Sequence, residues 1–150
     1  MTDETRTLPD LASGIRVGML TSTGPDGLRS RPVTVQKVSD HAIWFLVADD
    51  ADWLPEVDGK PINVSLVDDK TWVSATATGQ LIRDRAVLDD LGDPISDAWF
   101  EDGKEPVALQ VTAQHIDWWA APGKVGQIIG LAKGVLGDGP PDMGDRGEIN

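Results

Sequence analysis

The stretch TSTGPDGLRSRPVTVQ, residues 21–36, contains the signature of a β-hairpin. Pro and Gly gather in the turn GPDG at residues 24–27, and extended, β-prone segments flank it on both sides. This pattern is typical of two antiparallel strands joined by a tight turn. Because side chains two apart on a strand point to the same face, Arg29 and Arg31 are expected to share a face of the second strand.

The segments outside the hairpin alternate between strand and helix patterns. Apolar, β-prone runs predict strands over residues 15–23, 28–38, 41–48, 61–68, 71–82 and 107–120. Helical spacing of apolar residues favours helices over 83–92 and 123–137, with a short helix and a loop over 94–106. These features predict a mainly β fold, a small antiparallel barrel with a few helices that include a C-terminal helix.

Length and composition indicate one domain without covalent cross-links. The 150 residues can bury a single core, and residues 1–9 and 138–150 are expected to be extended tails. The absence of cysteine excludes disulfides and thiolate metal sites. The chain begins with polar residues and lacks any apolar run of roughly 18 to 20 residues, so we expect a soluble, cytoplasmic protein with no membrane partner.

The charge of the chain restricts its partners. Twenty-five acidic residues against thirteen basic ones give a formal net charge of −12. Such a surface repels a polyanion, so nucleic-acid binding is not expected.

Signatures of catalysis and metal binding are scarce. No acid at ligand spacing is evident for either His41 or His115, so both are interpreted as structural histidines and no metal site is predicted. Glycine-rich phosphate loops and a nucleophile elbow are absent, and no pair of carboxylates stands out as a general acid and base. No catalytic residue is therefore assigned.

The chain has six tryptophans and no tyrosine. Trp44 and Trp72 lie within predicted strands and are expected in the core. The others, at strand ends or beside loops, could cover a planar ligand or take part in ordinary packing: Trp53, Trp99, Trp118 and Trp119.

Several segments, in order, resemble one family. They are GMLTSTGPDGLRSRPVTVQ, IWFLVADD, INVSLVDDKTWVSATATGQLIRDR, AWFEDG and DWWAAPGKVGQIIGLAKGVLGDGPPDMG. Their order and spacing resemble the general stress protein branch of the pyridoxamine 5′-phosphate oxidase-like, FMN-binding split barrels, over residues 10 to 148.

The resemblance implies a six-stranded antiparallel split barrel that forms a homodimer, with two flavin sites between the subunits. Carried over to this chain, it implies a cofactor site lined by Ser30, Arg31, Pro32, Val33, Thr34, Leu46, Val47 and Ala48, with Trp99 and Trp119 from the partner subunit. Arg31 is expected near the flavin phosphate, because a guanidinium can bind a phosphate with two hydrogen bonds.

Two positions depart from the family pattern. The family usually has Thr or Ser where Val47 stands, and Lys where Trp53 stands, and both family residues serve the phosphate. Loss of two such donors could lower affinity at least about a hundredfold. Weak FMN binding, another ligand such as FAD or a deazaflavin, and a degenerate site filled by Trp53 all remain open.

The resemblance and its two departures suggest two functions. The first is an FMN-binding protein of the general stress type that exchanges electrons with a small-molecule redox partner such as a reduced nicotinamide. The second is a non-catalytic split-barrel dimer that acts as a ligand sensor or binding module.

Overall fold

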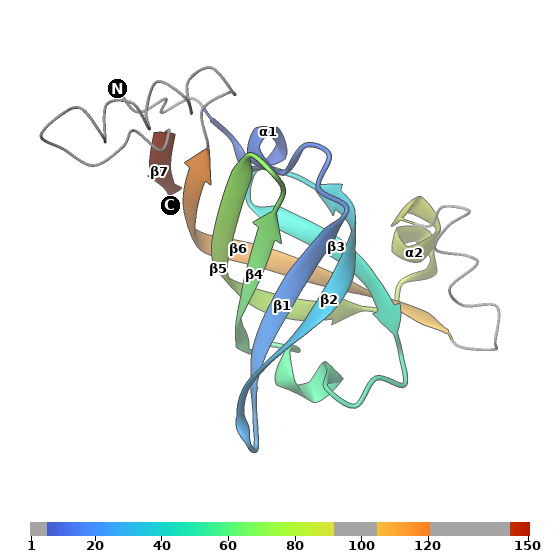
Figure 1. Cartoon of the computed structure of the whole chain (residues 1–150). Coiled ribbons are helices and arrows are strands. Elements are labelled where there is room, and N and C mark those ends of the chain that lie inside the picture. Colours follow the sequence, from blue (N-terminus) through green and yellow to red (C-terminus); the bar gives the residue numbers. More distant parts are fainter. Residues whose placement is uncertain (1–5, 92–104, 121–144) are drawn as a thin grey trace, which may run out of the picture.

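The computed structural model describes residues 6–91, 105–120 and 145–150. Within these ranges an antiparallel barrel is built from β1 (Val17–Gly24), β2 (Gly27–Val38), β3 (Ala42–Ala48), β4 (Pro61–Val67), β5 (Thr71–Ile82) and β6 (Pro106–Ala120). Neighbouring strands follow the order β3-β2-β1-β4-β5-β6, and a ladder between β3 and β6 closes the ring (Figure 1). The predicted mainly β, antiparallel barrel is confirmed.

The hairpin at residues 21–36 forms as expected. Gly24 pairs with Gly27, which leaves Pro25 and Asp26 as the two residues of the loop. Gly27 has a φ of +108°, a conformation that glycine adopts without the steric cost that a side chain would add.

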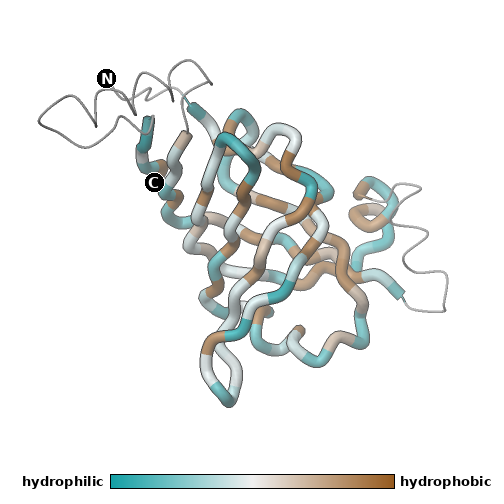
Figure 2. The backbone as a smooth tube through the Cα atoms, viewed as in Figure 1, coloured by the Kyte–Doolittle hydropathy of each residue, from teal (hydrophilic) through white to brown (hydrophobic). Residues whose placement is uncertain are grey.

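The core of the barrel is filled by alternate, inward-facing residues of its strands. Figure 2 shows apolar and polar positions interleaved along these strands. The inward set includes fully buried side chains from five of the strands: Leu20, Phe45, Val64, Leu66, Val73, Leu109 and Ile116. This period of two is the one that a strand with one buried face requires.

Two short helical segments cover opposite ends of the barrel (Figure 1). Helix α1 (Leu8–Ala12) places Leu8 and Leu11 in the core, and Thr7 begins it with a capping box in which Asp10 returns a hydrogen bond. At the other end, the 3₁₀ helix η1 (Leu54–Glu56) and the residue after it bury Leu54 and Val57. We call this second end, with η1 and the β1–β2 hairpin beside it, the barrel mouth.

One predicted helix is confirmed, and the two others lie wholly or largely outside the described residues. Helix α2 (Arg85–Leu91) falls within the predicted range and buries Leu91. The described residues do not include the expected C-terminal helix at 123–137 or most of the expected short helix and loop at 94–106. Trp99 also lies outside them. No helix in the described ranges is long and apolar enough to cross a membrane.

The end of the chain forms a strand that sequence reasoning missed. Strand β7 (Asp145–Ile149), expected to be part of an extended tail, pairs antiparallel with the end of β6. Gly147 lies directly opposite Trp118, so close that a Cβ there would meet the indole ring at 2.7 Å. Arg6 stacks on the same ring, 4.7 Å from its centroid, and binds Asp145 at 3.3 Å. These contacts order a segment whose composition favours disorder.

Candidate functional site

The outer face of β1, β2, β4, β5 and β6 carries side chains in three rows across the strands. An apolar row is formed by Val17, Val67, Trp72 and Trp119, which are 54%, 52%, 41% and 45% exposed. The expectation that Trp72 belongs to the core is therefore wrong, because this residue takes the outward phase of β5. Trp118, by contrast, takes the inward phase of β6 and is 2% exposed.

Two further rows run beside the apolar row. A mixed row contains Pro32, Met19, Ser65, Ser74 and Asp117, each opposite the next across a strand pair. A polar row contains Ser30, Thr21, Asn63, Thr76 and His115 in the same manner. Hydrogen bonds connect the side chains within and between rows, for example Thr21 with Ser30 at 2.6 Å and Asn63 with Ser74 at 3.0 Å. The outer face thus combines hydroxyl groups with a band of exposed apolar surface.

The predicted flavin-lining segment of β2 divides between the two faces of the strand. Ser30, Pro32 and Thr34 point outward, where Thr34 is paired with Val17 of the apolar row. Val33 is buried inside the barrel. Arg31 is paired with the fully buried Leu20 and so shares the inward phase.

Arg31 contacts Ser22 and Trp53 at the barrel mouth. Its guanidinium donates a hydrogen bond to Ser22 Oγ at 2.8 Å and lies over the Trp53 ring, 4.7 Å from the centroid. Ser22, 1% exposed, donates in turn to Glu56 Oε1 at 2.9 Å. Desolvation lowers the pKa of Arg31, while the charges of Glu56 and Asp52 oppose that shift. The guanidinium remains a cation that contacts an indole ring and a hydroxyl, with the charges of two carboxylates nearby.

The other predicted site residues also take different positions. Val47 is buried in the core, whereas Leu46 and Ala48 are half-buried and paired with Ala108 and Pro106 of β6. Trp53 packs against the core at the mouth, and Trp119 is exposed on the outer face. The structure therefore brings Arg31 together with Trp53, and it places Ser30, Pro32, Thr34 and Trp119 on one face.

These residues fit one part of a flavin better than another. The outward hydroxyls of Ser30 and Thr34, next to Met19 and the apolar row, suit the ring and ribityl chain. The phosphate, however, does not fit against Arg31 as that side chain stands, since it faces inward and adjoins Glu56 and Asp52.

Sequence reasoning missed the partners of His115. Its Nε2 lies 3.1 Å from Asp117 Oδ1 and its Nδ1 lies 2.6 Å from Asn150 Oδ1. The interpretation that no acid stands at ligand spacing is wrong, because His115 and Asp117 are two apart on one strand and therefore share a face. Glu148 joins them only through β7, whose pairing the sequence pattern did not indicate.

Comparisons with known proteins agree with the fold. The family model described as pyridoxamine 5′-phosphate oxidase like matches residues 3–142. A search of the curated proteins gives no match.

Among solved structures, a candidate general stress protein 26 from Jannaschia sp. CCS1 is 27% identical, with a TM-score of 0.75 and 94% of each chain covered. The general stress FMN/FAD binding protein from Xanthomonas citri is 26% identical, with a TM-score of 0.62, covering 71% of this chain and 80% of that one. An FAD binding protein from Mycobacterium smegmatis, 16% identical with a TM-score of 0.52 over 73% and 88% of the two chains, shares the fold. With its barrel and a family match over most of its length, this chain belongs to the pyridoxamine 5′-phosphate oxidase-like family.

Proposed function

We propose that this protein is a homodimeric flavin-binding protein of the general stress type and that FMN binds on the outer face of its barrel. The observation that carries the proposal is the arrangement of that face, where the hydroxyls of Ser30 and Thr34 border exposed apolar side chains. The flavin-binding relative in Xanthomonas citri supports the class of ligand.

The apolar row supports the homodimer. Four large apolar side chains, each more than two-fifths exposed, form a continuous band next to Met19, which is 43% exposed. A band of this kind is typical of a surface that a partner covers. A second copy is the occupant we propose, because pairing of two copies would bring the outward residues of β2 in one subunit near Trp119 of the other. The site would then be built from both chains.

The chemistry would be divided between cofactor and protein. When bound, FMN would supply two-electron redox chemistry with a small-molecule partner such as a reduced nicotinamide. The residues of this chain would orient the ring through Ser30 and Thr34 and shield it from water with Trp119. No catalytic side chain is assigned.

A second candidate function follows from the barrel mouth. Arg31 has internal partners, Val47 has no polar side-chain group, and Trp53 carries no positive charge for a phosphate. These observations favour a non-catalytic dimer that senses or binds a ligand with a different tail, or that binds no flavin.

The absorption spectrum and mass of the ligand in protein purified without added cofactor test the proposal. Flavin bands and a mass matching FMN are the expected result. A mass matching FAD or a deazaflavin would support the outer face as a binding site but would identify a cofactor other than FMN. Colourless protein that binds none of the three would favour the second candidate function. Oxidation of a reduced nicotinamide by the loaded protein would separate an enzyme from a binding module.

A further inference from the structure

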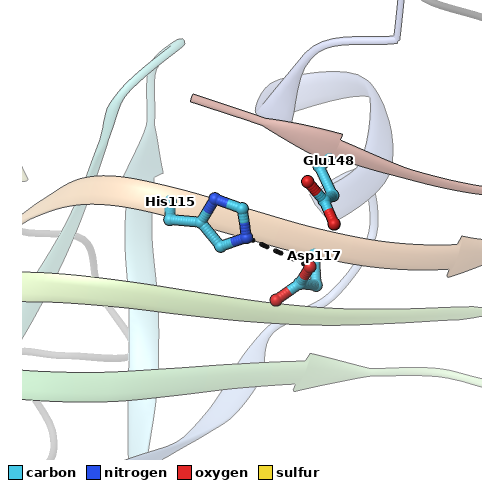
Figure 3. A group of neighbouring side chains, drawn as sticks. All are labelled: His115, Asp117 and Glu148. Carbon is cyan, nitrogen blue, oxygen red and sulfur yellow. Dashed lines mark hydrogen bonds and ion pairs between the residues drawn. The ribbon is translucent and has the colours of Figure 1, made fainter.

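Three potential metal ligands gather at the edge of the outer face, where β6 and β7 pair. They are His115 and Asp117 from β6 and Glu148 from β7 (Figure 3). Each offers one ligand atom, and these atoms lie within 4.8 Å of one another. His115 and Asp117 are half-buried and Glu148 is exposed, so the cluster is both positioned by the ladder and open to solvent.

The two carboxylates of this cluster face each other across the ladder. Asp117 and Glu148 are paired residues in adjacent antiparallel strands. Like charges directly opposite one another destabilise a strand pair. On the side of β5, the neighbouring outward residues are Ser74 and Thr76, which carry no charge. A positive charge between the carboxylates would remove the repulsion.

The imidazole of His115 has an oxygen atom beside each of its nitrogens. Nδ1 faces Asn150 Oδ1 at 2.6 Å, and Nε2 faces Asp117 Oδ1 at 3.1 Å. A neutral imidazole carries one N–H and can therefore donate to only one of these oxygens. If that proton is on Nδ1, the lone pair of Nε2 points toward Asp117, as it does in histidines that ligate metals and donate their other N–H to an oxygen. A rotated Asn150 amide would change the contact at Nδ1 but not the carboxylate at Nε2.

We propose that His115, Asp117 and Glu148 bind a divalent transition-metal cation of the zinc class. An imidazole combined with carboxylates favours such an ion over Mg²⁺ or Ca²⁺, which prefer oxygen ligands alone. Zinc lies about 2.0–2.2 Å from nitrogen and oxygen ligands, so two ligand atoms of one ion are at most about 4 Å apart. The 3.1 Å separation of His115 Nε2 and Asp117 Oδ1 meets this limit, and rotation of the exposed Glu148 side chain brings in the third ligand.

The site would fasten the last strand to the barrel. Two ligands belong to β6 and one to β7, so binding of the ion would stabilise the pairing of these strands. This role is separate from the proposed flavin site, because none of the three ligands belongs to the flavin-lining residues.

Calorimetric titration of the full-length protein with ZnCl₂ tests the proposal, with MgCl₂ and CaCl₂ titrated in parallel. We expect one saturable Zn²⁺ site per chain and at least tenfold weaker binding of the other two ions. His115→Gln should weaken Zn²⁺ binding by at least about tenfold, since loss of even an outer-shell partner of a metal ligand costs roughly 10- to 100-fold. His41→Gln is the matched control, because the chain has two histidines and His41 lies outside the cluster.

A second variant tests the same site independently, in case His115→Gln does not fold. Glu148→Gln keeps the size of the exposed side chain and should also weaken Zn²⁺ binding at least about threefold, without loss of the circular dichroism signal of the barrel. The proposal is overturned if the unsubstituted protein shows no saturable Zn²⁺ site. It is also overturned if His115→Gln binds Zn²⁺ as well as His41→Gln does, or if Ca²⁺ binds as tightly as Zn²⁺.

Discussion

The barrel mouth and the β6–β7 edge each place one basic side chain beside carboxylates, but they balance charge differently. At the mouth, Arg31 lies near Glu56 and Asp52 and is covered by the Trp53 ring. At the edge, His115 lies beside Asp117 and Glu148 on an open surface. A guanidinium stays charged at all ordinary pH values, so the mouth balances its own charge. The imidazole of His115 carries a positive charge only while it is protonated, so above its pKa the edge requires another cation.

The same contrast separates the inner and outer faces of β2. The inward Arg31 has its partners within the chain, whereas Ser30 and Thr34 belong to a face whose apolar row is exposed. We infer that the mouth is a structural element, and we propose the outer face as the surface that binds a ligand.

The largest effect is expected from a charge in the apolar row. Trp72→Glu should weaken self-association by at least about thirtyfold, equivalent to roughly 2 kcal/mol, because a carboxylate would be buried at the subunit contact. Light scattering over a concentration series measures this change. Leu28→Glu is the control, since Leu28 is 75% exposed near the hairpin tip and outside the row. Equal association of both variants would mean that the row is not the dimer contact.

A smaller effect is expected at the mouth. Arg31→Ala should lower the free energy of unfolding by about 1–3 kcal/mol, because the hydrogen bond to Ser22 and the contact with Trp53 are lost. Arg29→Ala, on the same side of β2 but exposed, should change it by less than about 0.5 kcal/mol. Urea unfolding of the two variants measures the difference. Similar values for both would show that the mouth contacts of Arg31 contribute little to stability.

The smallest effect is a dependence of stability on pH at the β6–β7 edge. Hydrogen bonds to Asn150 and then Asp117 raise the pKa of His115 above its ordinary value of 6.5. The protonated form is therefore favoured by folding, and its stabilising contribution is present below pH 6.5 and is lost as pH rises through the higher pKa of the folded state. In metal-free buffer, the stability advantage of the unsubstituted protein over His115→Gln should shrink between pH 6 and pH 9. Thermal unfolding across that range would reveal a constant difference if this explanation is wrong.

The fold could be predicted from the sequence because its signals are local. Apolar, β-prone runs and tight turns identify the barrel strands. The Asp68 side chain, which accepts from the backbone N–H groups of Lys70 and Thr71, explains why a turn forms between β4 and β5. Strand β7 has no such signal. Its order depends on the contacts of Gly147 with Trp118 and of Asp145 with Arg6, which join residues distant in sequence.

The candidate site could be predicted only in part. The prediction that Arg29 and Arg31 share a face is confirmed. Val33 and Val35 are apolar and lie in the same phase of β2 as Arg31. Because both are buried, this phase faces the barrel interior, and Arg31 therefore points inward. The flavin-lining role of Arg31 rests on the family resemblance, which does not specify the rotation of its side chain toward Ser22 and Trp53.

Titration of the purified protein with FMN, followed by the quenching of flavin fluorescence, tests the central claim most directly. The outer-face account predicts saturable binding of one FMN per chain, and Ser30→Glu should weaken it at least about tenfold by placing a carboxylate beside the ligand. Gln80→Glu, at an exposed position of β5 beyond the three rows, should leave the affinity unchanged. Equal binding by both variants, or no saturable binding of FMN at all, would contradict the assignment of the outer face as a flavin site.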